Sequence, residues 1–355
     1  MNKRQSNRNS RNIRTSSFSR LMSPSQIHAK NALSRDRNYG VKHGKKWREK
    51  ETVGNIRERL QETAHKKWSR YFHKEDAGKG ADWKVVLQRG KEYTSGFMKG
   101  AGVYTKMVPV PLRNTAAAIV CASRHTKTLQ SVLKELSALP LQEIVVVLHN
   151  ASDETFSHVR SYSNTLIAHF PEAIDPDVER SLGAKLTSAD TLLFVDGEFA
   201  VNAENLARFL WECDSRMDIA LNDISTKMGL FNQRAGTEFF REFLNRSLNR
   251  KDLRANSLLS LPFALSRNAL DTIGVSTLSV PVKAHATAIL RGLRIGVGGS
   301  VKSRVNRKPM VSGEKWRRIA GDHVEAWREA MTAKGSRLNF ADSIRNRSVL
   351  GDWER

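Results

Sequence analysis

The stretch Leu192-Leu193-Phe194-Val195-Asp196-Gly197-Glu198 is an apolar run that ends in two acidic residues separated by one glycine. An apolar run of this length, bounded by polar residues, is typical of a strand buried on both faces of a parallel sheet. The acids follow at the carboxyl end, where open α/β sheets bind ligands. Residues two apart in extended chain point the same way, so Asp196 and Glu198 could both offer oxygen to one hard cation. The alternative is a solvated acidic turn.

The sequence around this stretch alternates between strand and helix patterns. Apolar runs at 116–122 and 143–148 predict two further buried strands, and helical spacing predicts a helix near 153–168. This rhythm predicts an α/β fold, with a Rossmann-like, mostly parallel sheet flanked by helices over residues 111–310. Residues 311–355 form a C-terminal helical segment, which we expect to pack on that domain.

The positive charge is concentrated near the N-terminus. Residues 1–110 hold 26 Lys and Arg against 9 Asp and Glu, whereas the whole 355-residue chain has a net charge of +23. Residues 1–50 are rich in Ser, Asn and Arg and predict a disordered basic tail. Residues 51–110 predict a basic amphipathic helix followed by a Gly-rich linker of loops or short helices.

This basic region favours an anionic partner. We expect residues 1–73 to contact an anionic membrane surface or a cell-envelope polymer. Nucleic acid is not expected, because the region lacks interleaved aromatic residues and a recognisable recognition motif. No apolar run approaches the length of a membrane span, and the basic N-terminus lacks the apolar segment of a secretory signal. The two cysteines, Cys121 and Cys213, lie in apolar segments, so we expect a cytoplasmic protein.

Short polar segments follow three of the predicted strands, and their order carries a resemblance. They are Ser123-Arg124-His125, Asn150-Ala151-Ser152-Asp153-Glu154-Thr155 and Asp196-Gly197-Glu198. Together they resemble the nucleotide-binding half of family 2 glycosyltransferases, which have the GT-A fold, over roughly residues 115–300. The family's third segment is an Asp-x-Asp metal motif, in which glutamate here replaces the second aspartate. Residues 180–190 are similar to the family's stretch before that motif.

The resemblance implies a hexosyltransferase-like enzyme that moves a sugar from a nucleotide-sugar donor, expected to be UDP-linked. The acceptor is unidentified, and a cell-envelope molecule is one option. Asp196 and Glu198 would hold Mg²⁺ or Mn²⁺ and the diphosphate, since carboxylates bind such cations and the cation can stabilise the leaving diphosphate. Ser123 and Asp153 would lie by the base and ribose.

Two more residues are candidate nucleotide contacts, each with a structural alternative. Asn150 either contacts the nucleotide or supports a turn, and Arg180 either reaches the diphosphate or is an exposed helix charge. Asp153 could likewise be a helix N-cap.

The catalytic base is less defined. The family's acidic pair corresponds to residues 279–285, which contain no carboxylate. His285 and Asp223 are the candidate bases, and His323 could complete the metal site. Either histidine could instead be a core residue. The alternative function is a non-catalytic nucleotide- or polyanion-binding protein on a degenerate GT-A fold.

Overall fold

The computed structural model describes residues 24–51, 56–75, 80–122, 126–230, 232, 234, 236–302, 313–340 and 342. The strands are β1 (Ala116–Ala122), β2 (Glu143–His149), β3 (Thr165–Phe170), β4 (Thr191–Asp196), β5 (Ile219–Asn222), β6 (Phe263–Ser266) and β7 (Ile295–Gly299). The α-helices are α1 (Pro24–Arg48), α2 (Ile56–Lys74), α3 (Trp83–Ala101), α4 (Thr126–Leu136), α5 (Asp153–Arg160), α6 (Pro176–Lys185), α7 (Ala203–Ser215), α8 (Gly236–Ser247), α9 (Arg267–Ile273), α10 (Pro281–Leu290) and α11 (Gly313–Lys334). Short 3₁₀ helices include η1 (Ser225–Lys227) and η4 (Val275–Ser279).

Seven strands of the described chain form one sheet in the order β3-β2-β1-β4-β6-β5-β7. β6 runs antiparallel to its neighbours β4 and β5, and the other pairs are parallel. The carboxyl ends of the six parallel strands therefore meet at one side, the carboxyl edge, and their amino ends meet at the opposite side, the amino edge. The predicted α/β fold, with a mostly parallel sheet flanked by helices, is confirmed.

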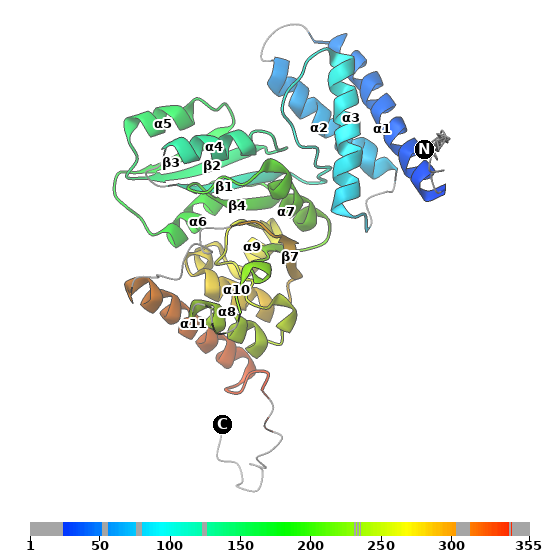
Figure 1. Ribbon diagram of the computed structural model, residues 1–355. Helices are drawn as coiled ribbons and strands as arrows, with labels where there is room; N and C mark the ends of the chain where they lie inside the picture. Colours follow the sequence, from blue (N-terminus) through cyan, green and yellow to red (C-terminus); the bar gives the residue numbers. More distant parts are fainter. Residues whose placement is uncertain are drawn as a thin grey trace, which may run out of the picture.

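The sheet separates two apolar cores. Leu193 and Val195 of β4 pack in the core that includes α2, α3, α4 and α7, whereas Leu192 and Phe194 pack in the core that includes α8, α9 and α10. Figure 1 shows α4 and α5 on one side of the sheet and α6 on the other. Because alternate strand residues point to opposite faces, Asp196 lies on the same face as Leu192 and Phe194, the face that α6 covers.

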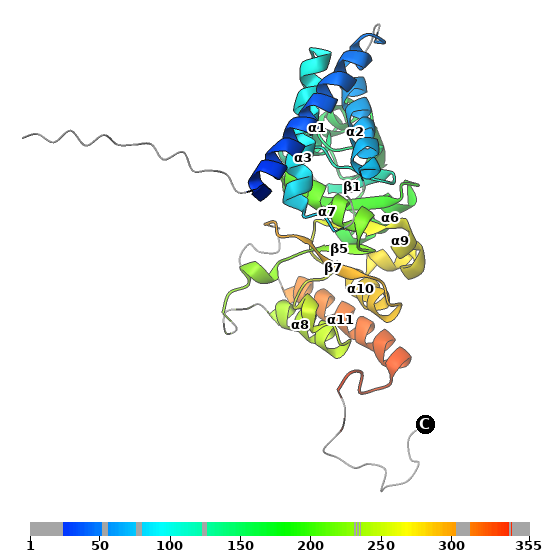
Figure 2. The ribbon, with the colours of Figure 1, turned by 90° about the vertical axis from the view of Figure 1, so that its right-hand side faces the viewer.

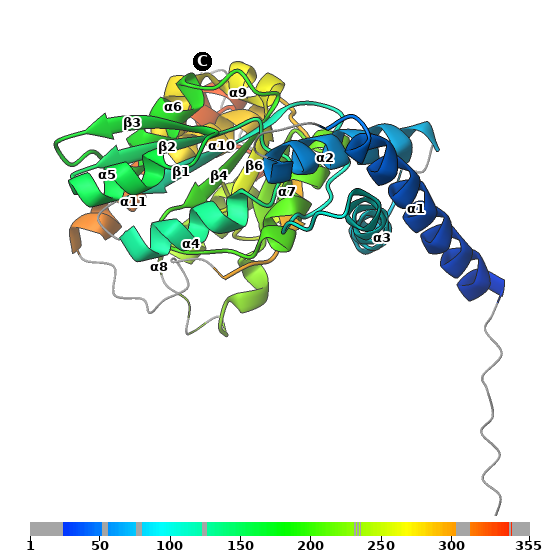
Figure 3. The ribbon, with the colours of Figure 1, turned by 90° about the horizontal axis from the view of Figure 1, so that it is seen from above.

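Helices α1, α2 and α3 stand together to one side of the sheet, at the opposite end of the molecule from α8 and α11 (Figures 2 and 3). α1 and α3 cross at four glycines, where a Cβ would collide with the facing backbone. A Cβ on Gly40 would lie 2.0 Å from the Tyr93 carbonyl oxygen, and one on Gly96 would lie 2.1 Å from that of Arg37. Glycine is therefore required at this crossing because the two backbones approach so closely.

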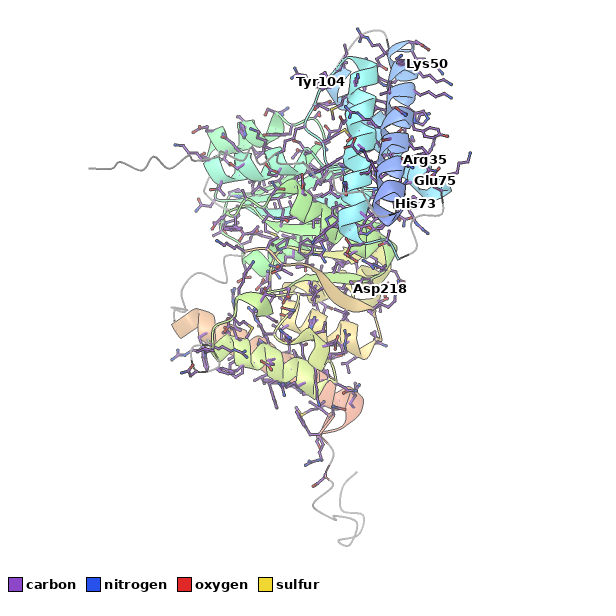
Figure 4. The ribbon with its side chains drawn as sticks, turned by 45° about the vertical axis from the view of Figure 1, so that its right-hand side comes forward. Arg35, Lys50, His73, Glu75, Tyr104 and Asp218 are labelled. Atoms are coloured by element: carbon purple, nitrogen blue, oxygen red, sulfur yellow. The ribbon has the colours of Figure 1, made fainter. Side chains whose placement is uncertain are left out.

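A buried ion pair also joins these three helices. Asp36 of α1 is fully buried and accepts hydrogen bonds from the Tyr71 hydroxyl of α2, at 2.9 Å, and from Nε of Arg89 of α3, at 2.8 Å. Beside it, Arg35 and Glu75 form an ion pair at 2.6 Å, and Figure 4 shows these two side chains next to each other. The helices are thus fixed by paired charge as well as by close backbone contact.

The structure corrects the predicted organisation of the first 110 residues. Residues 24–48, predicted as part of a disordered tail, form α1, and residues 83–101, predicted within a Gly-rich linker, form the single helix α3. The predicted amphipathic helix is confirmed as α2. Residues 1–23 lie outside the described part.

Two further points concern the rest of the chain. The helix predicted near 153–168 ends at Arg160 and is followed by the edge strand β3. The predicted C-terminal helix is confirmed as α11. None of the described helices is both long enough and apolar enough to cross a membrane.

Candidate functional site

The acidic segment after β4 forms a tight turn at the carboxyl edge. The Gly197 amide donates to the Cys121 carbonyl oxygen at 2.8 Å, which continues the pairing of β4 with β1. Oδ1 of Asp196 accepts a hydrogen bond from the Glu198 amide at 2.8 Å, so Glu198 is folded back toward Asp196. Both side chains are partly buried. The turn therefore holds the Asp196 carboxylate against the Glu198 backbone at the end of a central strand.

A divalent cation fits this donor set. Mg²⁺ is commonly bound by one or two carboxylates together with substrate phosphates and water. No group of three or more His, Cys, Asp or Glu side chains in the described chain is arranged to hold a metal ion. If a cation bound at this turn, Asp196 and Glu198 would be its protein ligands among the described residues, and phosphate and water would complete the coordination.

A buried acid lies behind this turn, on the α6 face of the sheet. Glu179 is only 2% exposed, and its Oε1 lies 2.9 Å from Nε2 of His149, the last residue of β2. Burial raises the pKa of Glu179 to about 8, and the charge of Asp196 contributes in the same direction. Burial also raises the pKa of the Cys121 thiol, with the charge of Glu179 adding to the effect. Glu179 thus holds a proton at neutral pH close to the carboxylates of the edge.

Asp223 follows β5 and lies on the same carboxyl edge. Its Oδ1 accepts hydrogen bonds from the Ser225 amide at 3.0 Å and from Nδ2 of Asn256 at 3.1 Å. β5 is two strands from β4, so Asp223 and Asp196 are separated by roughly 10 Å. Lys227 lies near Asp223, and its pKa is lowered by burial and by the charge of Lys302, which follows β7. This part of the edge therefore combines a carboxylate with two cations.

The segment after β2 contributes polar groups to the edge. Asn150 has a left-handed φ of 48°, and its backbone amide donates to the Phe170 carbonyl oxygen at 3.0 Å. It therefore supports the turn after β2, which is one of the two roles predicted for it. Ser152 is the N-cap of α5, because its Oγ accepts from the Thr155 amide at 3.3 Å. The N-cap alternative for Asp153 is therefore wrong. Asp153 is exposed in the first turn of α5, two strands away from Asp196.

Arg180 is neither exposed nor open to the edge. It is 5% exposed, donates from Nη1 to the Leu258 carbonyl oxygen at 2.9 Å and lies 3.2 Å from Oδ1 of Asp177. The exposed-charge alternative is thus wrong, and so is direct contact with a diphosphate, because the guanidinium is turned toward the backbone that precedes β6. Arg180 instead joins α6 to the loop before β6 through its hydrogen bond to Leu258.

The two predicted histidines are core residues. His285 of α10 is fully buried, and its Nε2 donates to Oδ1 of Asn245 at 2.8 Å, since the Asn245 amide nitrogen donates to two carbonyl oxygens. Burial lowers the pKa of His285 to about 3, so it carries no charge at neutral pH. A group with no access to solvent cannot reach an acceptor hydroxyl, and the prediction of His285 as a catalytic base is wrong.

His323 of α11 is also fully buried, with its ring against Phe240 and Trp327. Nδ1 lies 2.6 Å from the Ile319 carbonyl oxygen, and burial lowers the pKa to about 4. The prediction that His323 completes the metal site is wrong, because the ring is packed between α8 and α11. Ser123, the remaining predicted contact, lies outside the described residues.

Sequence reasoning missed the Glu179–His149 pair and Lys227, whereas it named Lys302 within a basic run that could lie near the diphosphate or be a solvated charge run. His149 is the last residue of a buried strand, as Asp196 is. Its position at a strand end could have indicated a residue of the carboxyl edge. Glu179 gave no signal of its own, because an acid in an amphipathic helix is expected to face solvent.

Comparison with known proteins adds structural likeness only. No model of a known protein family matches the chain, and no curated protein matches it. Among solved structures, it is similar to glucosyl-3-phosphoglycerate synthase from Mycobacterium tuberculosis in complex with UDP, with 14% identity, a TM-score of 0.46 and coverage of 60% of this chain and 80% of that one. The same enzyme with Mn²⁺, UDP-glucose and phosphoglyceric acid gives 15% identity and a TM-score of 0.46, with the same coverage.

The chain is also similar to a mannosyltransferase from Pyrobaculum calidifontis in complex with GDP-mannose and Mn²⁺. That likeness has 14% identity and a TM-score of 0.42, and it covers 78% of this chain and 76% of that one. Identities and TM-scores this low do not establish an activity or a ligand for this chain.

Proposed function

We propose that this chain is a glycosyltransferase of the GT-A type that uses a nucleoside-diphosphate sugar and a divalent cation. The observation that carries the proposal is the turn after β4, where Asp196 and Glu198 sit together at the carboxyl edge. The polar turn after β2 and Asp223 after β5 reach the same edge, one on each side of β4. The segments after β2 and β4 are two of the three on which the sequence resemblance rests, and the third, residues 123–125, lies outside the described part of the chain.

The leaving group of such a reaction is a diphosphate, which gains negative charge as the glycosidic bond breaks. Mg²⁺ or Mn²⁺ at Asp196 and Glu198 would supply Lewis-acid stabilisation of that charge. Lys227 and Lys302 add positive charge on the same edge, where preorganised charge is most effective. By the resemblance, Asp153 and Asn150 would contact the nucleotide, and a uridine donor is the one that the resemblance favours.

Asp223 is the candidate general base. Its hydrogen bonds from Ser225 and Asn256 engage Oδ1, and Oδ2 accepts none from the described residues. Oδ2 could therefore take the proton of an acceptor hydroxyl as the hydroxyl oxygen bonds to the anomeric carbon and the bond to the diphosphate breaks. The separation of roughly 10 Å between Asp223 and Asp196 leaves room for a sugar between them.

A non-catalytic nucleotide-binding protein remains the second candidate. The family's acidic pair corresponds to residues 279–285 of this chain. Residues 281–290 form the buried helix α10, which contains no carboxylate, and this observation favours the non-catalytic candidate.

Turnover separates the two candidates, whereas binding does not. The purified chain is incubated with a panel of UDP- and GDP-sugars and Mn²⁺, and release of the nucleoside diphosphate is measured with and without EDTA. We expect EDTA-sensitive release from at least one donor. Nucleotide binding without release from any donor, with and without a mixture of sugar and lipid acceptors, would favour the non-catalytic candidate.

A further inference from the structure

A large groove lies at the amino edge of the sheet, opposite the acidic turn. It encloses about 1500 Å³ between α2 and the segments that precede β1, β2 and β3. The α2 helix is held across it by hydrogen bonds at two points: Nε2 of Gln61 donates to the Ser137 carbonyl oxygen at 2.5 Å, and Oγ of Ser163 donates to Glu58 at 3.0 Å. We call this feature the amino-edge groove.

The lining of the amino-edge groove is strongly basic. Arg57, Lys66 and Arg70 come from α2, Arg113 precedes β1, and Lys134 comes from α4. None of these five side chains forms an ion pair with another described residue. By contrast, Arg59 in the same lining pairs with Glu51 at 2.7 Å, and Lys106 pairs with Glu135 at 2.6 Å. The lining holds seven Lys and Arg against the two acids Glu58 and Glu62, so the groove carries an excess of positive charge.

A buried histidine in the lining also lacks a partner. His65 is 5% exposed, and neither ring nitrogen has a hydrogen-bond partner among the described residues. Burial lowers its pKa to about 3, so the ring is neutral and carries one N–H donor. Buried polar groups are normally paired, and His65 in the wall of the groove is an exception among the described residues.

We propose that the amino-edge groove binds an extended polyanion, namely a linear polyphosphate chain recognised through its phosphates. From Arg57 to Arg70, the helix places cations over about 20 Å, which suits an extended chain. The enclosed volume also exceeds that of ordinary small-molecule pockets, which reach about 1000 Å³.

The lining disfavours two other anionic partners. Single-stranded nucleic acids are bound with aromatic side chains on which bases stack, and the lining contains one tyrosine, Tyr162, and no Trp or Phe. An anionic membrane presents a broad surface, whereas these cations come from both walls of a concave groove. The groove is also separated from Asp196 by the length of the strands, roughly 20 Å. The proposal is therefore independent of the proposed transferase activity.

The test measures binding of fluorescently labelled linear polyphosphate to the full-length chain by anisotropy at several salt concentrations. The groove variant carries Lys66→Glu and Arg70→Glu. The matched control carries Lys45→Glu and Lys46→Glu, the same charge change on exposed residues of α1 outside the groove. A second groove variant, Lys66→Gln with Arg70→Gln, avoids charge reversal, and thermal unfolding followed by circular dichroism checks that all variants fold.

We expect the groove variants to weaken polyphosphate binding at least tenfold and the control to change it less than about threefold. The slope of log K against log salt should become shallower by about 2 for the groove variants, since each lost phosphate contact contributes nearly one unit. Equal losses in groove and control variants would overturn the proposal. Tighter binding of oligo-dT than of polyphosphate, or binding to phosphatidylserine vesicles without binding to polyphosphate, would also overturn it in favour of the other partner.

Discussion

Several ionisable side chains of this protein are buried and fixed by partners within the fold. Asp36 accepts hydrogen bonds from Tyr71 and Arg89, and Glu179 pairs with His149 behind the acidic turn. Removing one partner of a buried ion pair such as Asp36–Arg89 leaves the other charge without compensation, which costs more than the net stabilisation by the pair. These residues therefore allow sharp tests of the structure.

We expect Asp36→Asn to lower the free energy of unfolding by about 3–5 kcal/mol, because the Arg89 guanidinium would lose its buried counter-charge. The control is Glu92→Gln, since Glu92 lies in an exposed pair with Arg37 at 4.0 Å. Exposed pairs of this kind contribute less than about 1 kcal/mol. Urea unfolding of both variants measures the difference, and equal effects would contradict the burial of Asp36.

Glu179 should make stability depend on pH. Its pKa is raised from 4.5 to about 8, so the folded chain retains a proton that the unfolded chain releases. The associated stabilisation is complete below pH 4.5 and is lost as the pH rises through 8. Relative to Glu179→Gln, the wild-type chain should lose up to about 1.4 kcal/mol of unfolding free energy per pH unit in this window.

Urea unfolding at several pH values between about 5 and 8 checks this dependence. The control is Glu154→Gln, on the exposed start of α5. Parallel pH profiles for wild type and Glu179→Gln would contradict the raised pKa.

For individual residues, the sequence predicted where a candidate side chain lies in the fold better than it predicted its chemical role. Asp196, Glu198 and Asp223 reach the carboxyl edge because each follows a strand, and strand ends can be predicted from apolar runs. His285 and His323 were assigned chemistry from residue type alone, and both proved to be buried between helices. Burial by partners distant in sequence cannot be predicted without the fold.

Among the secondary-structure elements, the crossing of α1 and α3 depends most on individual side chains. Gly44 illustrates this, because a Cβ there would lie 2.1 Å from the backbone carbonyl oxygen of Phe97. We expect Gly44→Ala to destabilise the chain by about 3 kcal/mol or more, since the helices would have to separate. Gly321→Ala is the control, because a Cβ at Gly321 in α11 meets nothing within 4 Å.

In an open helical position, alanine stabilises by about 0.5–1 kcal/mol relative to glycine. The two Gly→Ala variants should therefore change the unfolding free energy in opposite directions, as measured by urea unfolding. Destabilisation of similar size in both would show that helix propensity, and not the close crossing, determines the effect.

The same glycines explain which elements sequence could predict. The apolar runs of β1, β2 and β4 are local signals, and those strands were predicted. Glycine is a poor helix former, so its frequency in residues 83–101 favoured a linker, although Gly96 serves a tertiary contact with α1. The edge strand β3 was missed because it is only partly buried and lacks a continuous apolar run.

For the whole molecule, one apolar core extends from the N-terminal helices into the sheet domain. Trp68 and Phe72 of α2 belong to the same cluster as Trp211 of α7, and the Phe72 and Trp211 rings meet edge to face at 5.8 Å. The basic charge of the first 110 residues is thus carried partly by helices that are built into the fold. Sequence composition indicated the charge but not this packing, which joins residues more than 130 positions apart.

We expect the chain to unfold in one cooperative transition because of this shared core. Phe72→Ala should lower the unfolding free energy by about 3–5 kcal/mol and shift the whole transition. Leu230→Ala, at a side chain 71% exposed, should change it by less than about 0.5 kcal/mol. Two separate transitions, by circular dichroism and by tryptophan fluorescence, would contradict a core shared between the helices and the sheet.

The most direct test of the proposed function compares the rate of nucleoside-diphosphate release from the best donor, with Mn²⁺, for wild type and Asp196→Asn. The control is Asp271→Asn, an exposed carboxylate on α9, which follows the antiparallel strand β6 and so lies toward the amino edge. We expect Asp196→Asn to reduce the rate by about 100-fold or more and Asp271→Asn to leave it unchanged. An Asp196→Asn variant that keeps the wild-type rate and its dependence on Mn²⁺ would contradict the assignment of the acidic turn as the metal and diphosphate site.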